Sequence, residues 1–200
     1  DSIAHMMAAP VLETFYGFRV GDPLGGIYAV SHDFVEELAH EARFWGEAIQ
    51  GAGIDFWLLT RAITWNKNIC EVSMGGRVIP HSLEVRNRVF ADNARAIFAA
   101  IKKDESIWRQ EKTVIKVADI LARSEIKKPD MISYSIQQLR GKFARGLGEQ
   151  MSVLEGFTDK GELQRLVTVT DEDFNMPDQI WVKALFYLLL QHVFPVGKSG

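Results

Sequence analysis

Residues 21–30 read GDPLGGIYAV, and this stretch decides where the first helical part of the chain gives way to other structure. Pro23 removes a backbone hydrogen-bond donor, while Gly25 and Gly26 permit backbone angles that other residues rarely adopt. We therefore expect a tight loop over residues 21–27 that enters a short strand over residues 27–30. Backbone amides without bulky side chains in front of them also suit close contact with a sugar or a carboxylate. A lone Pro-Leu-Gly-Gly run is more often a structural turn, so its meaning depends on the residues around it.

The segments after this loop alternate between helical and extended patterns. Ser31 suits the N-cap of a helix, and apolar residues recur at helical spacing from residue 34 to residue 45. A second, buried helix is expected over residues 54–65. Residues 68–74 alternate with a period of two, which predicts a strand, and residues 77–79 suit another short strand.

The remainder of the chain has mainly helical patterns. Residues 1–15 lead into a helix with Pro10 in its first turn and Tyr16-Gly17 at its end. Beyond Ser82, apolar faces predict helices over four stretches, residues 85–101, 114–121, 131–154 and 179–194. The predicted fold class is therefore α/β with a few short strands over residues 1–81, followed by a mainly α-helical region over residues 82–200.

Composition narrows the class of protein. The 200 residues are 47% hydrophobic and 10% aromatic, which is enough to bury a core. Lys and Arg total 23 against 26 Asp and Glu, so the charge gives no reason to expect nucleic acid or an anionic membrane as partner. The longest apolar stretch, residues 182–196, contains polar interruptions and is shorter than the roughly 20 residues of a membrane span. It predicts a buried core helix.

Cysteine usage and the N-terminus suggest a compartment. The single cysteine, Cys70, has no intramolecular disulfide partner, and its apolar neighbours Ile69 and Val72 predict a small buried side chain. A reducing cytoplasm is the expected location. The 200 residues show no secretory signal at their start, and the absence of an initial Met suggests that the chain begins inside a longer protein.

Two residues could carry chemistry. Asp55 lies at the start of the helix expected over residues 54–65, where it could cap the helix, accept hydrogen bonds from sugar hydroxyls or act as a general base. His81 follows Pro80 in a loop after the predicted strands, and a neutral imidazole there could ligate a divalent ion bound to a pyrophosphate. A lone histidine is more often structural, so the residue gains weight only from its neighbours.

Taken together, these pieces resemble a known enzyme group. The order Pro-Leu-Gly-Gly, Gly-Ile-Asp, strand and His before a long helix is similar to the C-terminal half of mannosylglycerate synthase and the related glucosylglycerate and glucosyl-3-phosphoglycerate synthases. These are retaining glycosyltransferases of the glycosyltransferase-A fold. The resemblance rests on Asp22-Pro23-Leu24-Gly25-Gly26, Gly53-Ile54-Asp55, His81, Phe98-Ala99-Ala100-Ile101, Phe174-Asn175-Met176, Trp181 and His192-Val193-Phe194.

The resemblance implies roles for the candidate residues. Leu24, Gly25 and Gly26 would line the donor sugar, with Pro23 beside them in an apolar pocket, and Asp55 would contact the sugar hydroxyls. His81 would be the third ligand of Mg²⁺ or Mn²⁺. The other ligands would come from an Asp-x-Asp motif in a nucleotide-binding half that is not among these 200 residues, so this chain alone would be inactive. The sequence departs from the family at Ser82-Leu83-Glu84, where basic residues are usual, and at Pro80, which replaces a small residue.

The implied reaction is transfer of a hexose from a nucleotide sugar, GDP-mannose or UDP- or GDP-glucose, to a small hydroxy acid such as glycerate or phosphoglycerate. Residues 1–81 would be the acceptor and metal side of the catalytic domain, and residues 82–200 a helical region. Two alternatives stay open. One is an inverting glycosyltransferase in which Asp55 is the base, and the other is a non-catalytic helical module for interaction or homo-oligomerisation.

Overall fold

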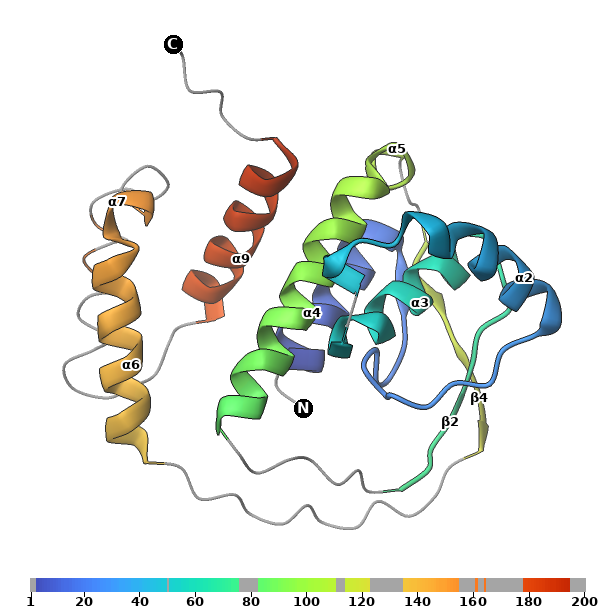
Figure 1. Ribbon diagram of the computed structural model, residues 1–200, viewed down its shortest axis with the longest axis horizontal. Helices are drawn as coiled ribbons and strands as arrows, with labels where there is room; N and C mark the ends of the chain where they lie inside the picture. Colours follow the sequence, from blue (N-terminus) through green and yellow to red (C-terminus); the bar gives the residue numbers. More distant parts are fainter. Residues whose placement is uncertain are drawn as a thin grey trace. The chain divides into compact units, whose positions relative to one another are not determined.

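The computed structural model describes residues 3–49, 51–75, 83–110, 114–122, 135–154, 161, 164 and 178–194. The chain divides into two compact units, Asp1–Pro129 and Asp130–Gly200 (Figure 1). The predicted class is confirmed, because helices alternate with a few short parallel strands in the first unit and the described part of the second unit is helical. The predicted functional division at residue 81 stays a prediction.

The first unit begins with a helical stretch over residues 4–16. It consists of η1 (Ala4–Ala8), α1 (Ala9–Val11) and η2 (Leu12–Tyr16), of which η1 and η2 are π-helical. The helix starts before Pro10, earlier than expected, but it ends where the sequence predicts. Gly17 has a φ of 62° and forms the left-handed C-cap, a conformation that glycine adopts without steric cost.

Two further predicted helices are present. α2 (His32–Glu41) is capped by Ser31, whose Oγ accepts a hydrogen bond from the backbone N–H of Phe34 at 3.4 Å. Short 3₁₀ turns, η3 (Ala42–Phe44), η4 (Glu47–Ile49) and η5 (Gly51–Gly53), connect it to α3 (Ile54–Thr64).

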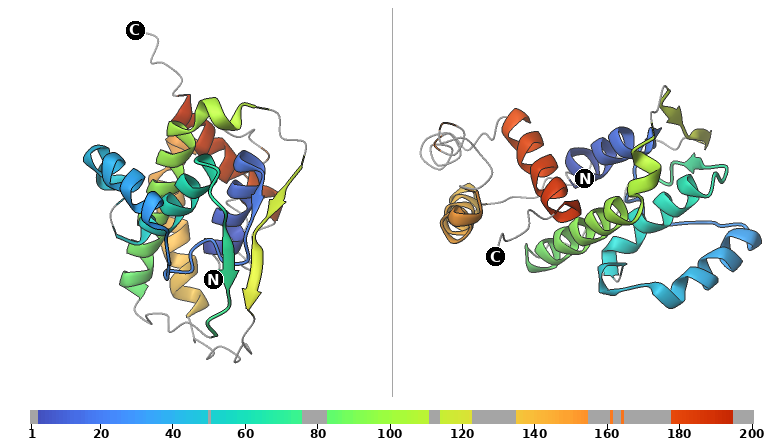
Figure 2. Two further views of the ribbon diagram at one scale, coloured as in Figure 1. Left: turned by 90° about the vertical axis from the view of Figure 1, so that its right-hand side faces the viewer. Right: turned by 90° about the horizontal axis from the view of Figure 1, so that it is seen from above.

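Four short strands form two parallel pairs in the described part of the chain. β1 (Phe18–Arg19) pairs with β3 (Lys116–Val117), and β2 (Cys70–Val72) pairs with β4 (Asp119–Ala122). In Figure 2 (left), β2 and β4 run side by side in the same direction. The strand predicted over residues 68–74 is thus confirmed in shortened form.

Two secondary-structure predictions were wrong. Residues 27–30 form no strand, and Ile27 is 74% exposed. The helix predicted over residues 114–121 is extended instead, because the β-branched residues of this stretch suit a strand and two parallel neighbours supply hydrogen bonds.

The prediction of a buried Cys70 was also wrong. Cys70 is exposed, as is Val72 on the same strand. Its apolar sequence neighbours did not determine its burial, because β2 is short and both of its ends lie at the surface.

α4 (Leu83–Lys103) packs against η5 and α3, and α5 (Glu105–Trp108) follows it. The buried side of α4 includes Ala96, Ile97, Ala100 and Ile101. The first unit therefore continues beyond residue 81, and α4 belongs with the helices that precede it.

The described part of the second unit contains α6 (Ile136–Glu149), α7 (Met151–Leu154) and α9 (Asp178–Val193). They confirm the helices predicted over residues 131–154 and 179–194. Ser135 caps α6 by accepting a hydrogen bond from the Gln138 N–H at 3.3 Å. Among the described residues, no helix has the length and apolar character needed to cross a membrane.

Candidate functional site

The loop that follows β1 is attached to β2 through a carboxylate. The backbone N–H of Gly21 donates to both oxygens of Glu71 at 2.8 Å, and the N–H of Asp22 donates to Oε1 of Glu71 at 3.2 Å. Asp22 in turn accepts a hydrogen bond from the N–H of Leu24 at 3.1 Å, which closes a tight turn around Pro23. The predicted loop is present, and its conformation is fixed by a residue 50 positions away in sequence.

The side chains of this loop divide into buried and exposed ones. Pro23 is fully buried, and Leu24 is 3% exposed, so both anchor the loop in the protein. Gly25 is half-buried and Gly26 is exposed with a φ of 77°. The main chain at Gly25 and Gly26 is therefore the part of the predicted donor site that is accessible to a ligand. Pro23 and Leu24 pack into the protein interior and hold the loop in place.

The strands explain how the loop and β2 come together. The backbone N–H of Ala118 donates to Arg19 at 3.0 Å, and the N–H of Asp119 donates to Ile69 at 3.4 Å. Consecutive residues of a strand point their N–H groups to opposite edges, so the segment over residues 116–122 has β1 on one edge and β2 on the other. Each edge is occupied over part of this segment, by β1 along residues 116–118 and by β2 along residues 119–122, and residues 27–30 do not pair with it.

The parallel arrangement places two predicted pieces of the site after strands that run the same way. The loop over residues 21–26 follows the carboxyl end of β1, and the segment that leads to His81 follows the carboxyl end of β2. Ligands of open α/β sheets bind outside the carboxyl ends of the strands. His81 itself lies outside the described residues. No group of three or more His, Cys, Asp or Glu side chains that could hold a metal occurs in the described part of the chain.

Asp55 is the second residue of α3 and is half-buried. The N-cap residue is Gly53, so Asp55 lies inside the first turn, where the positive end of the helix dipole favours a carboxylate. This position suits an ionised acceptor of hydrogen bonds. Its predicted role in binding or catalysis stays a prediction.

The other residues that carry the resemblance lie elsewhere. Ala100 and Ile101 on α4 have no exposed surface and belong to the core of the first unit. Trp181 and residues 192–194 lie on α9 and at its end, in the second unit. Phe174-Asn175-Met176 is outside the described residues.

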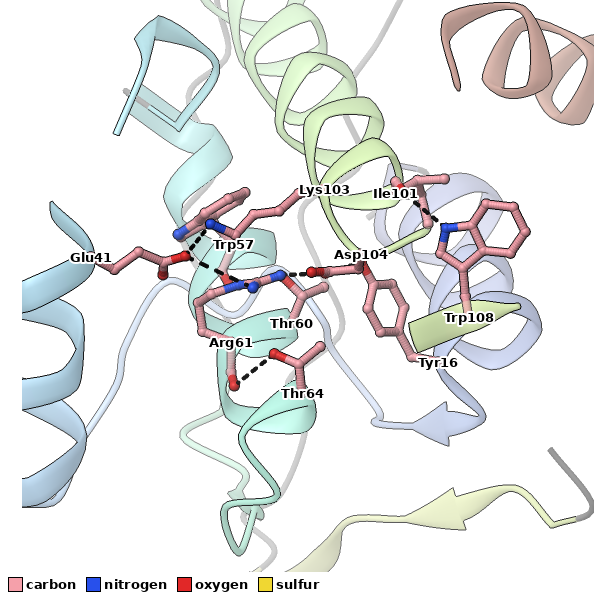
Figure 3. A network of polar contacts seen from close by, with 10 residues as sticks. All are labelled: Tyr16, Glu41, Trp57, Thr60, Arg61, Thr64, Ile101, Lys103, Asp104 and Trp108. Atoms are coloured by element: carbon pink, nitrogen blue, oxygen red, sulfur yellow. Dashed lines mark hydrogen bonds and ion pairs between the residues drawn. The ribbon is translucent and has the colours of Figure 1, made fainter. Parts of the chain in front are cut away.

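Sequence reasoning missed a buried ionic network in the first unit, drawn in Figure 3. Arg61 on α3 donates from Nη2 to Oδ2 of Asp104, and Tyr16 donates from its hydroxyl to the same oxygen at 2.7 Å. Arg61 and Asp104 are each 2% exposed. The network therefore joins the end of the first helical stretch, the last turn of α3 and the residue that follows α4.

A second carboxylate balances the charge of this network. Oε1 of Glu41 lies 3.9 Å from Nη1 of Arg61 and also forms an ion pair with Lys103. The ring of Trp57 lies beneath both cations, with its centroid 4.6 Å from Cζ of Arg61 and 5.3 Å from Nζ of Lys103. Two cations and two anions compensate each other, as buried charges require.

The network keeps the Tyr16 hydroxyl protonated. Burial raises the pKa of Tyr16 well above its usual range, and the negative charge of Asp104 and the hydrogen bond to it raise that pKa further. Tyr16 is 4% exposed. We interpret the network as a structural one, because its central groups are removed from solvent. The one signal in the sequence was Arg61, a charged residue in the last turn of a mainly apolar helix.

In comparisons with family models, curated proteins and solved structures, no match to this chain was found.

Proposed function

We propose that this chain is part of a metal-dependent glycosyltransferase that moves a hexose from a nucleotide sugar to a small hydroxy acid such as glycerate or phosphoglycerate. One observation carries the proposal. The loop Asp22-Pro23-Leu24-Gly25-Gly26 is held after the carboxyl end of β1 by Glu71 of β2, the strand whose continuation leads to His81. Glu71 thereby links one motif piece, the loop, to the strand that precedes the segment containing His81 in the sequence.

The residues of this chain would bind and orient the donor sugar. Gly25 and Gly26 present backbone without side chains, which allows a sugar ring to approach closely. Asp55 would accept hydrogen bonds from the sugar hydroxyls, and the apolar base formed by Pro23 and Leu24 would exclude water. In the reaction, the bond between the anomeric carbon and the diphosphate oxygen breaks. A bond to the acceptor hydroxyl oxygen forms, and the hydroxyl proton leaves with the nucleoside diphosphate.

A divalent metal would neutralise the charge of the departing diphosphate. Mg²⁺ and Mn²⁺ both suit a pyrophosphate with oxygen-rich ligation, to which a neutral imidazole would add one nitrogen ligand. His81 is the residue of this chain that we assign to the metal. Further ligands would come from the Asp-x-Asp motif of the nucleotide-binding half.

The inverting alternative uses the same residues, with Asp55 as the base that deprotonates the acceptor. The configuration of the product at the anomeric carbon separates the two mechanisms.

The alternative of an interaction module has one observation in its favour. Val117, Ile120 and Leu121 on β3 and β4 are between 51% and 67% exposed. Parallel sheets are usually covered on both faces. Exposed apolar side chains on these strands are therefore unusual, and such a surface is typical of a site that binds another protein.

The test is a transfer assay on the natural full-length protein that contains these residues. Wild type, His81→Ala and the control His40→Ala, which removes an exposed imidazole on α2, are incubated with GDP-mannose, UDP-glucose or GDP-glucose. Glycerate and 3-phosphoglycerate are the acceptors, with and without Mn²⁺. We expect metal-dependent transfer that falls by about 100-fold or more in His81→Ala and is unchanged in His40→Ala.

No transfer with any donor would overturn the glycosyltransferase proposal and favour the interaction module. Transfer that is equal in His81→Ala and wild type would overturn the assignment of His81 to the metal.

A further inference from the structure

We propose that Glu71 is a positioning residue for the donor loop, a role that deepens the proposed function and rests on it. Its carboxylate fixes the two residues that precede Pro23, and through them it sets where the accessible backbone of Gly25 and Gly26 lies. Glu71 would not contact the substrate itself. It would act by holding the loop in the conformation that receives the sugar.

The contact between Glu71 and the loop consists of several short hydrogen bonds. Three hydrogen bonds join two consecutive backbone amides to the two carboxylate oxygens, with two of them at 2.8 Å. Hydrogen bonds from N–H groups to a carboxylate are stronger than those between neutral groups. A Cβ atom placed on Gly21 would lie 3.3 Å from Oε1 of Glu71, which is tighter than ordinary packing. Glycine at position 21 therefore permits the close approach of the carboxylate.

The strand is irregular at the residue that provides this carboxylate. Glu71 lies opposite Ile120 of β4, but the next residue, Val72, lies opposite Ala122, so β4 has the extra residue Leu121 at this point. An extra residue in one strand of a pair bends the ladder and redirects nearby side chains, and such irregularities are frequent next to functional sites. The register shift falls between Glu71 and Val72, directly beside the residue whose carboxylate holds the loop.

The rest of the loop has little freedom of its own. Pro23 and Leu24 are buried, and the side chain of Asp22 bonds the N–H of Leu24. The hydrogen bond from the Leu24 N–H to Asp22 links the residues that Glu71 holds to the residue before Gly25, so a movement at residues 21 and 22 is passed on through this turn. Displacements of about 1 Å in a positioned substrate can reduce turnover by about 100-fold. Loss of the Glu71 carboxylate should consequently reduce the rate of transfer.

The experiment compares Glu71→Ala, Glu71→Gln and the control Asp119→Ala in the natural full-length protein. Asp119 is an exposed acidic residue on the neighbouring strand, paired in register with Cys70. We expect Glu71→Ala to lower kcat/KM for the nucleotide sugar by about 10-fold to 100-fold, mainly through kcat. Glu71→Gln should recover most of this loss, because its amide oxygen still accepts hydrogen bonds from the two N–H groups. Asp119→Ala should match wild type.

A second readout follows the loop without activity. Hydrogen exchange at the amides of Gly21 and Asp22 should become faster in Glu71→Ala and stay slow in Asp119→Ala. Unchanged exchange in Glu71→Ala would overturn the positioning role, as would an active Glu71→Ala enzyme with the kcat/KM of wild type. A lower KM for the acceptor in Glu71→Ala would also overturn the positioning role. It would mean that the Glu71 carboxylate lies close enough to repel the anionic acceptor, and Glu71 would then border the substrate directly. A wild type without transfer to any acceptor would overturn the proposed function and this inference together, whereas wild-type transfer with an indifferent Glu71→Ala overturns only the inference.

Discussion

Two carboxylates in the first unit join segments that are far apart in sequence, and their surroundings differ. Glu71 binds the backbone of Gly21, 50 residues away, at the surface of the molecule. Asp104 binds Tyr16, 88 residues away, and Arg61, 43 residues away, in the interior. The chemistry of the two anchors is similar, but their accessibility to water is not. Burial therefore distinguishes an anchor in the interior, at Asp104, from an anchor in contact with solvent, at Glu71.

Water can replace one anchor but not the other. When the carboxylate of Glu71 is removed, the amides of Gly21 and Asp22 can bond to solvent. When the carboxylate of Asp104 is removed, the guanidinium of Arg61 loses its closest partner in a place that solvent does not reach. An unpaired buried charge costs far more than the pair contributed when intact. The two positions should therefore differ in how much the loss of their carboxylate lowers the free energy of unfolding.

The largest expected effect is that of Asp104→Ala. It should lower the free energy of unfolding by about 3–5 kcal/mol, because it leaves the buried Arg61 and the Tyr16 hydroxyl without their shared acceptor. Urea denaturation followed by circular dichroism measures the change. The control is Glu105→Ala, which removes the neighbouring carboxylate from an exposed pair with Arg109 and should cost about 1 kcal/mol or less.

Asp104→Asn covers the case in which the alanine variant does not fold. Its amide oxygen can still accept from Tyr16 and Arg61, so it should be more stable than Asp104→Ala but less stable than wild type. A loss in Asp104→Ala no greater than in Glu105→Ala would contradict the contrast between buried and exposed anchors.

The helices could be predicted from local signals, whereas the strands depended on their partners. Ser31 and Gly17 act within a few residues, so the ends of helices that they mark were visible in the sequence. Residues 27–30 and 114–121 are both rich in strand-forming side chains, but only the second segment has neighbours with which to pair. Pairing is a tertiary property, and the pattern of a single segment does not determine it.

The candidate site was predictable in part. The tight loop around Pro23 followed from its proline and glycines, since these residues restrict or extend the backbone locally. Glu71 was not foreseen, because a carboxylate that binds backbone amides 50 residues away leaves no pattern in either segment. The partner of Arg61 was hidden for the same reason, although a charge in an apolar helix indicates that some partner exists.

A smaller effect is expected from the pH dependence of Tyr16. The pKa of Tyr16 is raised by burial and by Asp104, so above its unfolded value of about 10 the unfolded chain releases this proton while the folded protein retains it. The stability contributed by Tyr16 is therefore complete below about pH 10 and falls above it, by about 1.4 kcal/mol per pH unit. Tyr16→Phe should remove this component of the pH dependence.

The measurement is the free energy of unfolding between pH 8 and about pH 11 for wild type and Tyr16→Phe. At pH 8 the variant should be less stable by about 1–3 kcal/mol, because Asp104 loses a buried hydrogen bond. The difference should shrink as the pH rises. A constant difference across this range would show that Tyr16 titrates equally in the folded and unfolded states. Water would then reach the Asp104 network, and the contrast between a buried and an exposed anchor would not hold.

The smallest effect is expected from Glu71→Ala, for which the free energy of unfolding should fall by about 1 kcal/mol or less, since water can satisfy the released amides. Urea denaturation of Glu71→Ala and Asp104→Ala under the same conditions compares the two losses in the free energy of unfolding directly. A loss as large as that of Asp104→Ala would mean that the loop is part of the folding core, and any loss of transfer in Glu71→Ala could then follow from instability alone. A small loss of stability combined with a large loss in kcat would separate the two anchors, as expected if Glu71 acts on the proposed transfer only through the position of the loop.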